Sequence, residues 1–257
     1  MRLTVVGCSG SYPGPDSPAS CYLLEADLDG RTWRVLLDLG NGALGALQRY
    51  VDPLDIDAVL LSHLHADHCL DLCGYYVLRK YHPAGPQPRL PVYGPSGTAG
   101  RMARAYDLPE DPGMSLEFDF RTWAPGEPAR IGPFTVQAIR VEHPVEAYGL
   151  RVSAGGSLLA YTGDSGRCTQ LESVARGADV LLAEASFRDE DANPPGIHLT
   201  GGDCGRLARD AEVTRLVVTH VPPWHDPKEM LIAAQQAWDG AAELARPGAV
   251  LEIQGMA

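Results

Sequence analysis

Short apolar segments recur along the chain, and polar stretches rich in glycine or proline separate them. In the first half, their β-branched character predicts strands over residues 3–6, 21–25, 34–38, 58–62 and 90–94. The second half repeats this rhythm, with strands predicted over residues 134–141, 148–153, 158–162, 180–184, 216–220 and 249–254. The pattern therefore predicts many short strands in both halves of the chain.

Longer segments with apolar residues on one helical face lie between these strands. They predict helices over residues 42–50, 67–81, 97–106, 201–211 and 228–246. Strands interleaved with helices are typical of a layered α/β fold. No linker divides the chain into independent parts, so we expect one domain over residues 1–257.

The composition is that of a globular protein, with 45% hydrophobic and 21% charged residues. Acidic residues outnumber basic ones, and the formal net charge is −12. Because binding of duplex nucleic acid depends on Lys and Arg displacing counterions, we expect no stable binding of nucleic acid. A small anionic substrate held at a cationic metal centre remains compatible with this charge.

The N-terminal residues and the cysteines indicate where the protein works. Residues 1–7 have the pattern of a strand and lack the long apolar segment of a secretory signal. No segment approaches the roughly 18 apolar residues that a membrane span requires. The six cysteines are scattered, without the density of a disulfide scaffold. We therefore expect a cytoplasmic protein that has no membrane segment.

The densest group of chemically active side chains directly follows the strand predicted over residues 58–62. His63, His65, Asp67 and His68 lie within six residues there. Alternate residues of an extended segment share a face, and a turn into a helix would bring His68 back toward that face. Crowded imidazoles and carboxylates are unfavourable unless a cation binds them, so the group predicts a metal site.

Three further residues of the metal-ligand type follow other predicted strands. His143 comes after residues 134–141, Asp164 lies in a glycine-flanked turn after 158–162, and His220 ends 216–220. Alone, each such residue more often caps a turn or satisfies a local hydrogen bond than binds a metal. Together they mark the ends of separate strands, which is where α/β folds build their sites.

This arrangement resembles the metallo-β-lactamase fold superfamily, whose signature is HxHxDH followed by a separate His, Asp and His. The resemblance implies an αββα sandwich, in which two mixed sheets are flanked by helices. It also implies two divalent metal ions: one held by His63, His65 and His143, the other by Asp67, His68 and His220, with Asp164 bridging them. Asp38 would orient the histidines. Zinc is the expected metal, with manganese or iron as alternatives.

Two later segments resemble motifs of the tRNase Z-like phosphodiesterases. Residues 183–187 (AEASF) resemble their HEATF-type segment, although Ala183 replaces the usual His, and residues 197–200 (IHLT) resemble their HST motif. In that branch the Glu orients the His, which protonates the departing alkoxide. The resemblance thus makes Glu184 and His198 catalytic. Asp67 would orient the attacking hydroxide that the two metals share.

Five further segments resemble the atypical cyclic nucleotide phosphodiesterases of this superfamily; they cover residues 7–11, 15–20, 44–49, 61–72 and 219–224. This resemblance implies hydrolysis of a small cyclic nucleotide such as 3′,5′-cAMP, and a homodimer. The tRNase Z enzymes commonly carry a tRNA-gripping arm between the His and bridging-Asp motifs. Only 20 residues separate His143 from Asp164, which favours a small phosphodiester over folded tRNA.

Three alternatives stay open at this point. The protein could be a nuclease that processes tRNA 3′ ends, a non-catalytic protein that keeps metals for stability, or a lactonase or thioesterase. The last class has no need of an alkoxide-protonating histidine. Tyr148, Phe187 and Trp224 lie beside motif residues and are candidates either for stacking on a purine or for packing in a wall.

Overall fold

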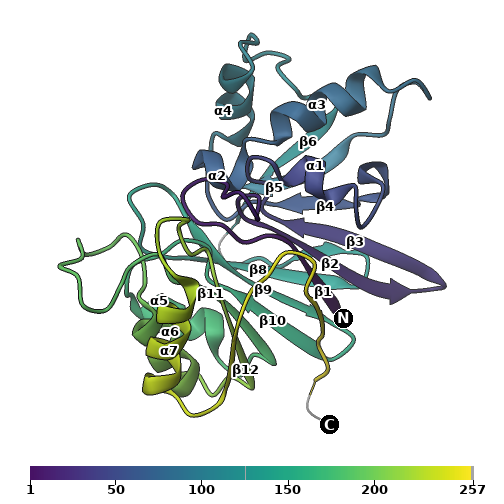
Figure 1. The fold of residues 1–257 in the computed structure, drawn as a ribbon. Coiled ribbons are helices and arrows are strands. Elements are labelled where there is room, and N and C mark those ends of the chain that lie inside the picture. The colour runs from purple at the N-terminus through teal and green to yellow at the C-terminus, as the bar shows by residue number, and fades with distance from the viewer. Residues whose placement is uncertain (125, 256–257) are drawn as a thin grey trace.

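Two seven-stranded sheets lie in the middle of the molecule, and helices cover them on the outside (Figure 1). The computed structural model describes residues 1–124 and 126–255. The first sheet contains, in spatial order, β14 (Val250–Glu252), β1 (Arg2–Gly7), β2 (Cys21–Leu28), β3 (Arg31–Leu37), β4 (Ala58–Leu60), β5 (Leu90–Gly94) and β6 (Phe118–Thr122). The second contains β13 (Ala241–Leu244), β12 (Arg215–Thr219), β11 (Val180–Glu184), β10 (Ser157–Tyr161), β9 (Tyr148–Ala154), β8 (Phe134–Arg140) and β7 (Ala129–Ile131).

The helices divide into two groups, one for each sheet. The first group contains α1 (Ala43–Leu47), α2 (Ala66–Cys69), α3 (Leu72–Tyr81) and α4 (Thr98–Ala105), with a 3₁₀ turn, η1 (Pro53–Asp55), beside them. The second contains α5 (Thr169–Ala175), α6 (Gly201–Asp210) and α7 (Pro227–Ala237). Figure 1 shows the two groups on opposite sides of the paired sheets.

Alternating side chains explain why this molecule has four layers. Successive residues of a strand point to opposite faces, so a strand buried on both sides is apolar throughout. In β2, Leu24 packs between the sheets and Leu23 packs under the first helices; in β11, Leu182 and Leu181 divide in the same way. Three buried apolar clusters result, one between each pair of layers. The predicted αββα sandwich is confirmed.

Strand direction brings several loops to one edge of each sheet. In the second sheet β10, β11 and β12 are parallel, and β8 and β10 both run antiparallel to β9, which lies between them. In the first sheet β3 and β4 are parallel. The loops that carry the candidate ligands leave the carboxyl ends of these strands.

The helix predicted over residues 67–81 is two helices, α2 and α3. The backbone N–H of Asp71 donates to the carbonyl of Leu39, at 3.2 Å, instead of continuing the helical pattern. Gly40 lies against the same turn, and a Cβ at that position would come within 2.0 Å of the Asp67 carbonyl oxygen. A close contact with the loop after β3 therefore interrupts the helix beside the predicted metal site.

The helix predicted over residues 228–246 is wrong beyond Ala237. Trp238 is extended, with ψ of 129°, and residues 241–244 form β13, which pairs in parallel with β12. The Ala-rich sequence of this strand favours a helix, but pairing at the sheet edge overrides that local preference. Strands β6 and β7 and helix α5 were not predicted from the sequence. None of the described helices has the length and apolar character that a membrane crossing requires.

Candidate metal centre

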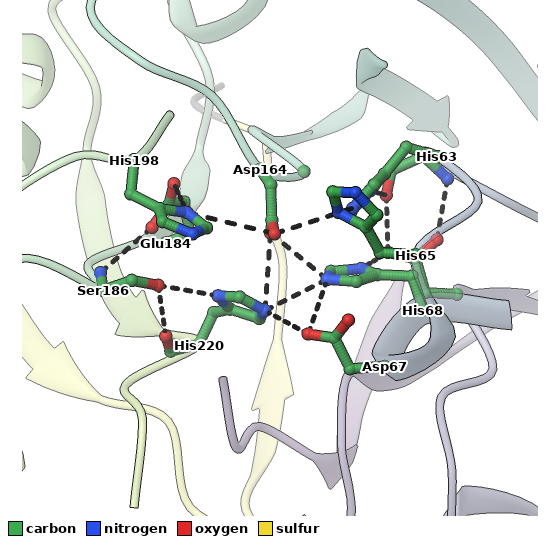
Figure 2. A network of polar contacts seen from close by, with 12 residues as sticks. His63, His65, Asp67, His68, Asp164, Glu184, Ser186, His198 and His220 are labelled. Carbon is green, nitrogen blue, oxygen red and sulfur yellow. Dashed lines mark hydrogen bonds and ion pairs between the residues drawn. The ribbon is translucent and has the colours of Figure 1, made fainter. Parts of the chain in front are cut away.

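The seven predicted ligands meet at the carboxyl ends of four strands (Figure 2). We call them the ligand cluster: His63, His65, Asp67 and His68 after β4, His143 after β8, Asp164 after β10, and His220 after β12. Their donor atoms form two groups, and within each group all of these atoms lie within 4.8 Å of one another. The structure thus brings together residues that are up to 157 positions apart in the sequence.

The first group contains three imidazoles and one carboxylate. His65 Nδ1 lies 3.0 Å from His63 Nε2 and 3.2 Å from His143 Nε2, and His63 Nε2 lies 3.6 Å from Asp164 Oδ2. Four ligands arranged tetrahedrally about a zinc ion at about 2.0–2.1 Å are separated by roughly 3.3 Å. The spacing of this group matches such a site.

The second group contains two imidazoles and two carboxylates. His220 Nε2 lies 3.0 Å from His68 Nε2 and 3.1 Å from Asp67 Oδ2. His68 Nε2 is 3.2 Å from Asp164 Oδ1. Asp164 therefore offers one oxygen to each group, and Figure 2 shows it between them. This is the geometry of a carboxylate that could bridge two cations.

The charges of the ligand cluster also fit bound cations. Burial and the neighbouring His68 hold the pKa of His63 well below its usual range, so this imidazole is neutral. Burial alone would raise the pKa of Asp164, but His220 and His68 outweigh it and keep the carboxyl ionised. Asp164 Oδ1 is buried and has no hydrogen bond to any described residue. A buried, ionised oxygen that accepts no hydrogen bond is unfavourable unless positive charge lies beside it.

The same demand for positive charge is found at His68. Burial alone would lower the pKa of its imidazole, but the carboxylates of Asp164 and Asp38 outweigh burial and raise it well above the usual range. At Asp67, burial opposes ionisation, but hydrogen bonds from His220 and His68 hold the pKa well below its usual range. Imidazole nitrogens and ionised carboxylates together form a donor set that suits zinc and related divalent metals.

Asp38 directly follows β3 and contacts the ligand cluster through His68. Its fully buried carboxylate accepts hydrogen bonds from the backbone and hydroxyl of Ser62, at 2.7 and 2.8 Å, and from Tyr161, at 2.7 Å. His68 Nδ1 lies 2.7 Å from Asp38 Oδ2. Because Nδ1 is occupied in this way, His68 presents Nε2 to the second group.

Two residues of the site have left-handed backbone conformations. Asp38 has a φ of 58° and His220 a φ of 55°. Residues other than glycine adopt such angles rarely, and they persist where the surroundings fix them. At His220 the surroundings include Ser186, whose hydroxyl lies 2.9 Å from both the Nδ1 and the carbonyl oxygen of His220.

Glu184 and His198 form a pair beside the ligand cluster. His198 Nδ1 lies 2.9 Å from Glu184 Oε1 and 3.9 Å from Asp164 Oδ2. The buried Glu184 carboxylate also accepts hydrogen bonds from three backbone N–H groups, those of Ser165, Ser186 and Leu199. Burial alone would lower the pKa of His198, but the Glu184 carboxylate outweighs it and raises the pKa to about 9.

Three residues of this site were not predicted: Ser62, Tyr161 and Ser186. Each supports a site residue that was predicted; Ser62 and Ser186 lie inside segments that carry the family resemblance, and Tyr161 lies in a predicted strand. Of the candidate base-stacking residues, Tyr148 is buried and donates to Glu146, which favours packing. Phe187 meets the His198 ring edge-on at 5.0 Å, and Trp224 is 60% exposed beside Tyr12.

Several known proteins are similar to this chain over most of its length. An uncharacterized protein of Mycobacterium leprae is 46% identical and covers 99% of this chain and 89% of its own length. The probable metallo-hydrolase YhfI of Bacillus subtilis is 28% identical, over 98% of this chain and 100% of that protein. Ribonuclease Z of Myxococcus xanthus is 26% identical, over 98% of each chain.

Solved structures and a family match agree with these relatives. The crystal structure of YhfI, a metallo-β-lactamase fold protein, superposes with a TM-score of 0.85 at 27% identity, covering 98% of this chain and 99% of that one. The short form of human tRNase Z gives a TM-score of 0.74 at 22% identity, covering 99% and 100%. The family described as a beta-lactamase superfamily domain matches residues 33–221. The chain therefore belongs to the metallo-hydrolases of the β-lactamase superfamily, in the tRNase Z-like branch.

Proposed function

We propose that this protein is a dinuclear-metal phosphodiesterase that hydrolyses cyclic nucleotides such as 3′,5′-cAMP. The observation that carries the proposal is the Glu184–His198 pair, whose imidazole lies 3.9 Å from the central Asp164. A hydrolase that expels an alkoxide benefits from a general acid beside the reacting group, whereas hydrolysis of a thioester or an activated lactone does not require one. The pair therefore favours phosphodiester chemistry within the superfamily.

His198 has the properties of that acid. Its Nδ1 faces Glu184, so Nε2 is the ring nitrogen left to meet a substrate oxygen. The raised pKa, about 9, keeps the imidazole protonated at neutral pH. Glu184 is itself fixed by three backbone donors, which holds the imidazole in one orientation.

The ligand cluster would hold two divalent metals, with His63, His65 and His143 on one side, Asp67, His68 and His220 on the other, and Asp164 between them. When bound, the metals supply positive charge that neutralises the phosphoryl oxygens and lowers the pKa of water. Asp67 uses Oδ2 to contact His220, so its Oδ1 is left to orient the attacking water. We assign the general acid to His198, with Glu184 as the residue that positions it.

The bonds and protons of the reaction balance with these residues. The oxygen of water forms a bond to phosphorus, and the bond from phosphorus to the 3′-oxygen of the sugar breaks. The 3′-oxygen keeps the electron pair and takes a proton from His198. The product is then a nucleoside 5′-monophosphate, and His198 regains its proton from the water that attacked.

The alternative is a tRNA 3′-processing endonuclease, which the 26% identity to ribonuclease Z favours. Two observations argue for the smaller substrate. Between His143 and Asp164 the chain forms β9 and β10, which pair closely and leave no residues for a protruding arm there. The net charge of −12 also opposes the binding of a long polyanion.

Incubation with 3′,5′-cAMP and with an unprocessed tRNA in parallel separates these two functions. We expect release of 5′-AMP and no cleavage of the tRNA. The matched control is the His198→Ala variant, which should lose cAMP turnover while keeping its metals. Cleavage of the tRNA with no turnover of any cyclic nucleotide would overturn the proposal in favour of the endonuclease.

A further inference from the structure

A pocket of about 290 Å³ lies directly beside His198, which forms part of its wall. Three chain segments line it, and each carries or adjoins a residue of the site. Glu142 precedes the ligand His143, Arg167 follows Asp164 by three positions, and residues 193–196 lead into His198. The pocket and the proposed reaction centre are therefore built from the same segments.

Close backbone packing fixes these walls relative to the ligand cluster. A Cβ on Gly166 would come within 2.4 Å of the Cα of Gly196, so the two segments touch at their backbones. Gly166 N–H donates to the carbonyl of Glu142 at 2.7 Å. His143 Nδ1 lies 2.9 Å from the carbonyl oxygen of Ile197. A ligand in the pocket would thus be held in a defined position relative to His198.

Polar side chains line the pocket and can hydrogen-bond an occupant. Arg167 contacts the buried Asp203 through Nε, at 2.5 Å, and no hydrogen bond joins its terminal nitrogens to a described residue; 69% of its side chain is exposed. Arg206 contacts the same carboxylate at 2.7 Å. The Glu142 carboxylate likewise has no hydrogen bond to a described side chain. Arg167 therefore offers a donor group at the pocket and Glu142 an acceptor group.

The proposed reaction determines what such a pocket would receive. In that reaction, the leaving group is the sugar, whose 3′-oxygen accepts a proton from His198. The organic part of that group stays attached to the oxygen and must lie beyond His198, where this pocket is. In a cyclic nucleotide this part is the ribose with its base, which offers both N–H and O–H donors and ring acceptors.

We propose that this pocket holds the nucleoside whose 3′-oxygen departs, and that Glu142 and Arg167 determine specificity for it. The inference rests on the proposed phosphodiesterase function. The Glu142 carboxylate accepts hydrogen bonds from the hydroxyl or amino groups of the nucleoside, and the terminal nitrogens of Arg167 donate to its acceptors. The volume of the pocket is close to the lower limit for small-molecule sites, about 300 Å³, and suits a single nucleoside.

Binding of adenosine to the intact protein tests this assignment without turnover. Equilibrium dialysis measures the Kd of adenosine and, separately, of inorganic phosphate. We expect saturable binding of adenosine, and a Kd that Glu142→Gln and Arg167→Ala each raise about tenfold, the effect of one charged hydrogen bond. Phosphate binding should stay unchanged in Glu142→Gln. Arg209→Ala removes an exposed arginine at the far end of α6 and is the matched control.

The outcomes separate this inference from the proposed function. If adenosine does not bind, or if its Kd is the same in both variants as in the wild type, the pocket assignment is overturned, even if cAMP is hydrolysed. If adenosine binds through Glu142 and Arg167 but no cyclic nucleotide is hydrolysed, the pocket assignment stands and the proposed function fails.

Discussion

The ligand cluster and the Glu184–His198 pair lie side by side, but their polar groups are satisfied in different ways. Within the pair, every partner is a protein group: the imidazole faces a carboxylate that three backbone N–H groups also hold. Within the ligand cluster, nitrogen and oxygen atoms face one another at 3.0–3.6 Å, and Asp164 Oδ1 has no hydrogen bond to a described residue.

This difference teaches that one half of the site depends on metal and the other does not. In the ligand cluster, the partners of the carboxylates are imidazoles that are themselves metal ligands, so bound cations should stabilise the fold there. The pair should keep its geometry with or without metal. Metal content and the dependence of the rate on the leaving group can therefore be changed separately by substitutions.

The largest effect is expected from His63→Ala, which removes a fully buried ligand. Loss of a single oxyanion-stabilising donor already costs about 100- to 1,000-fold in other enzymes, so loss of a metal should cost more than about 1,000-fold. Metal analysis should show a fall from about two ions per chain to one or fewer. His82→Ala, which alters the histidine that ends α3 and is not part of the ligand cluster, is the control; unchanged turnover and metal content in His63→Ala would contradict the proposed metal site.

Replacement of His198 by Ala should affect turnover but not metal content. We expect a loss of roughly 100- to 10,000-fold on cAMP, whose leaving alkoxide needs a proton. On bis(p-nitrophenyl) phosphate the loss should be much smaller, because p-nitrophenolate departs without protonation. The measurement is kcat for both substrates together with metal analysis. An equal loss on both substrates would show that His198 does not act as the general acid.

An intermediate effect is expected at Asp38, which contacts His68 from outside the ligand cluster. In Asp38→Asn, the amide would present N–H donors to the hydroxyls of Ser62 and Tyr161 and to His68 Nδ1. Removal of such a supporting carboxylate typically lowers metal affinity about 10- to 100-fold. Titration of the apoprotein with zinc measures this change. An unaltered zinc affinity in Asp38→Asn would show that Asp38 does not support metal binding.

The smallest effect concerns pH. His198 has its pKa raised to about 9, so it holds its proton at lower pH and loses it as the pH rises through that value. Bound cations would repel the imidazolium, so we expect kcat on cAMP to fall on the alkaline side with an apparent pKa at or below about 9. The His198→Ala variant should lack this decline. A decline that persists unchanged in the variant would assign it to another group.

The ligand cluster could be predicted from the sequence because its chemistry is concentrated. His63, His65, Asp67 and His68 are too close in sequence to be accidental, and His143, Asp164 and His220 each end an apolar strand that alternation predicts. The supporting residues could not be found in this way. Ser62 and Tyr161 act through hydrogen bonds to Asp38 that span 24 and 123 positions, and serines and tyrosines are common at many other positions.

The errors in the fold have a similar cause. Residues 241–244 have the composition of a helix, and only pairing with β12 makes them a strand. The interruption between α2 and α3 depends on Leu39, which accepts a hydrogen bond from a residue 32 positions further along. The pattern within a short segment predicts a buried strand well, because nearly every residue of such a strand is apolar. Such a local pattern does not predict which distant segment will pair with the edge of a strand or contact the end of a helix.

Metal content and cAMP turnover, measured on one preparation, test the central claim most directly. We predict about two divalent metal ions per chain and release of 5′-AMP from 3′,5′-cAMP, with both lost after chelation and both restored when metal is returned. A preparation that holds two metals and hydrolyses bis(p-nitrophenyl) phosphate, but leaves every cyclic nucleotide intact, would contradict the claim.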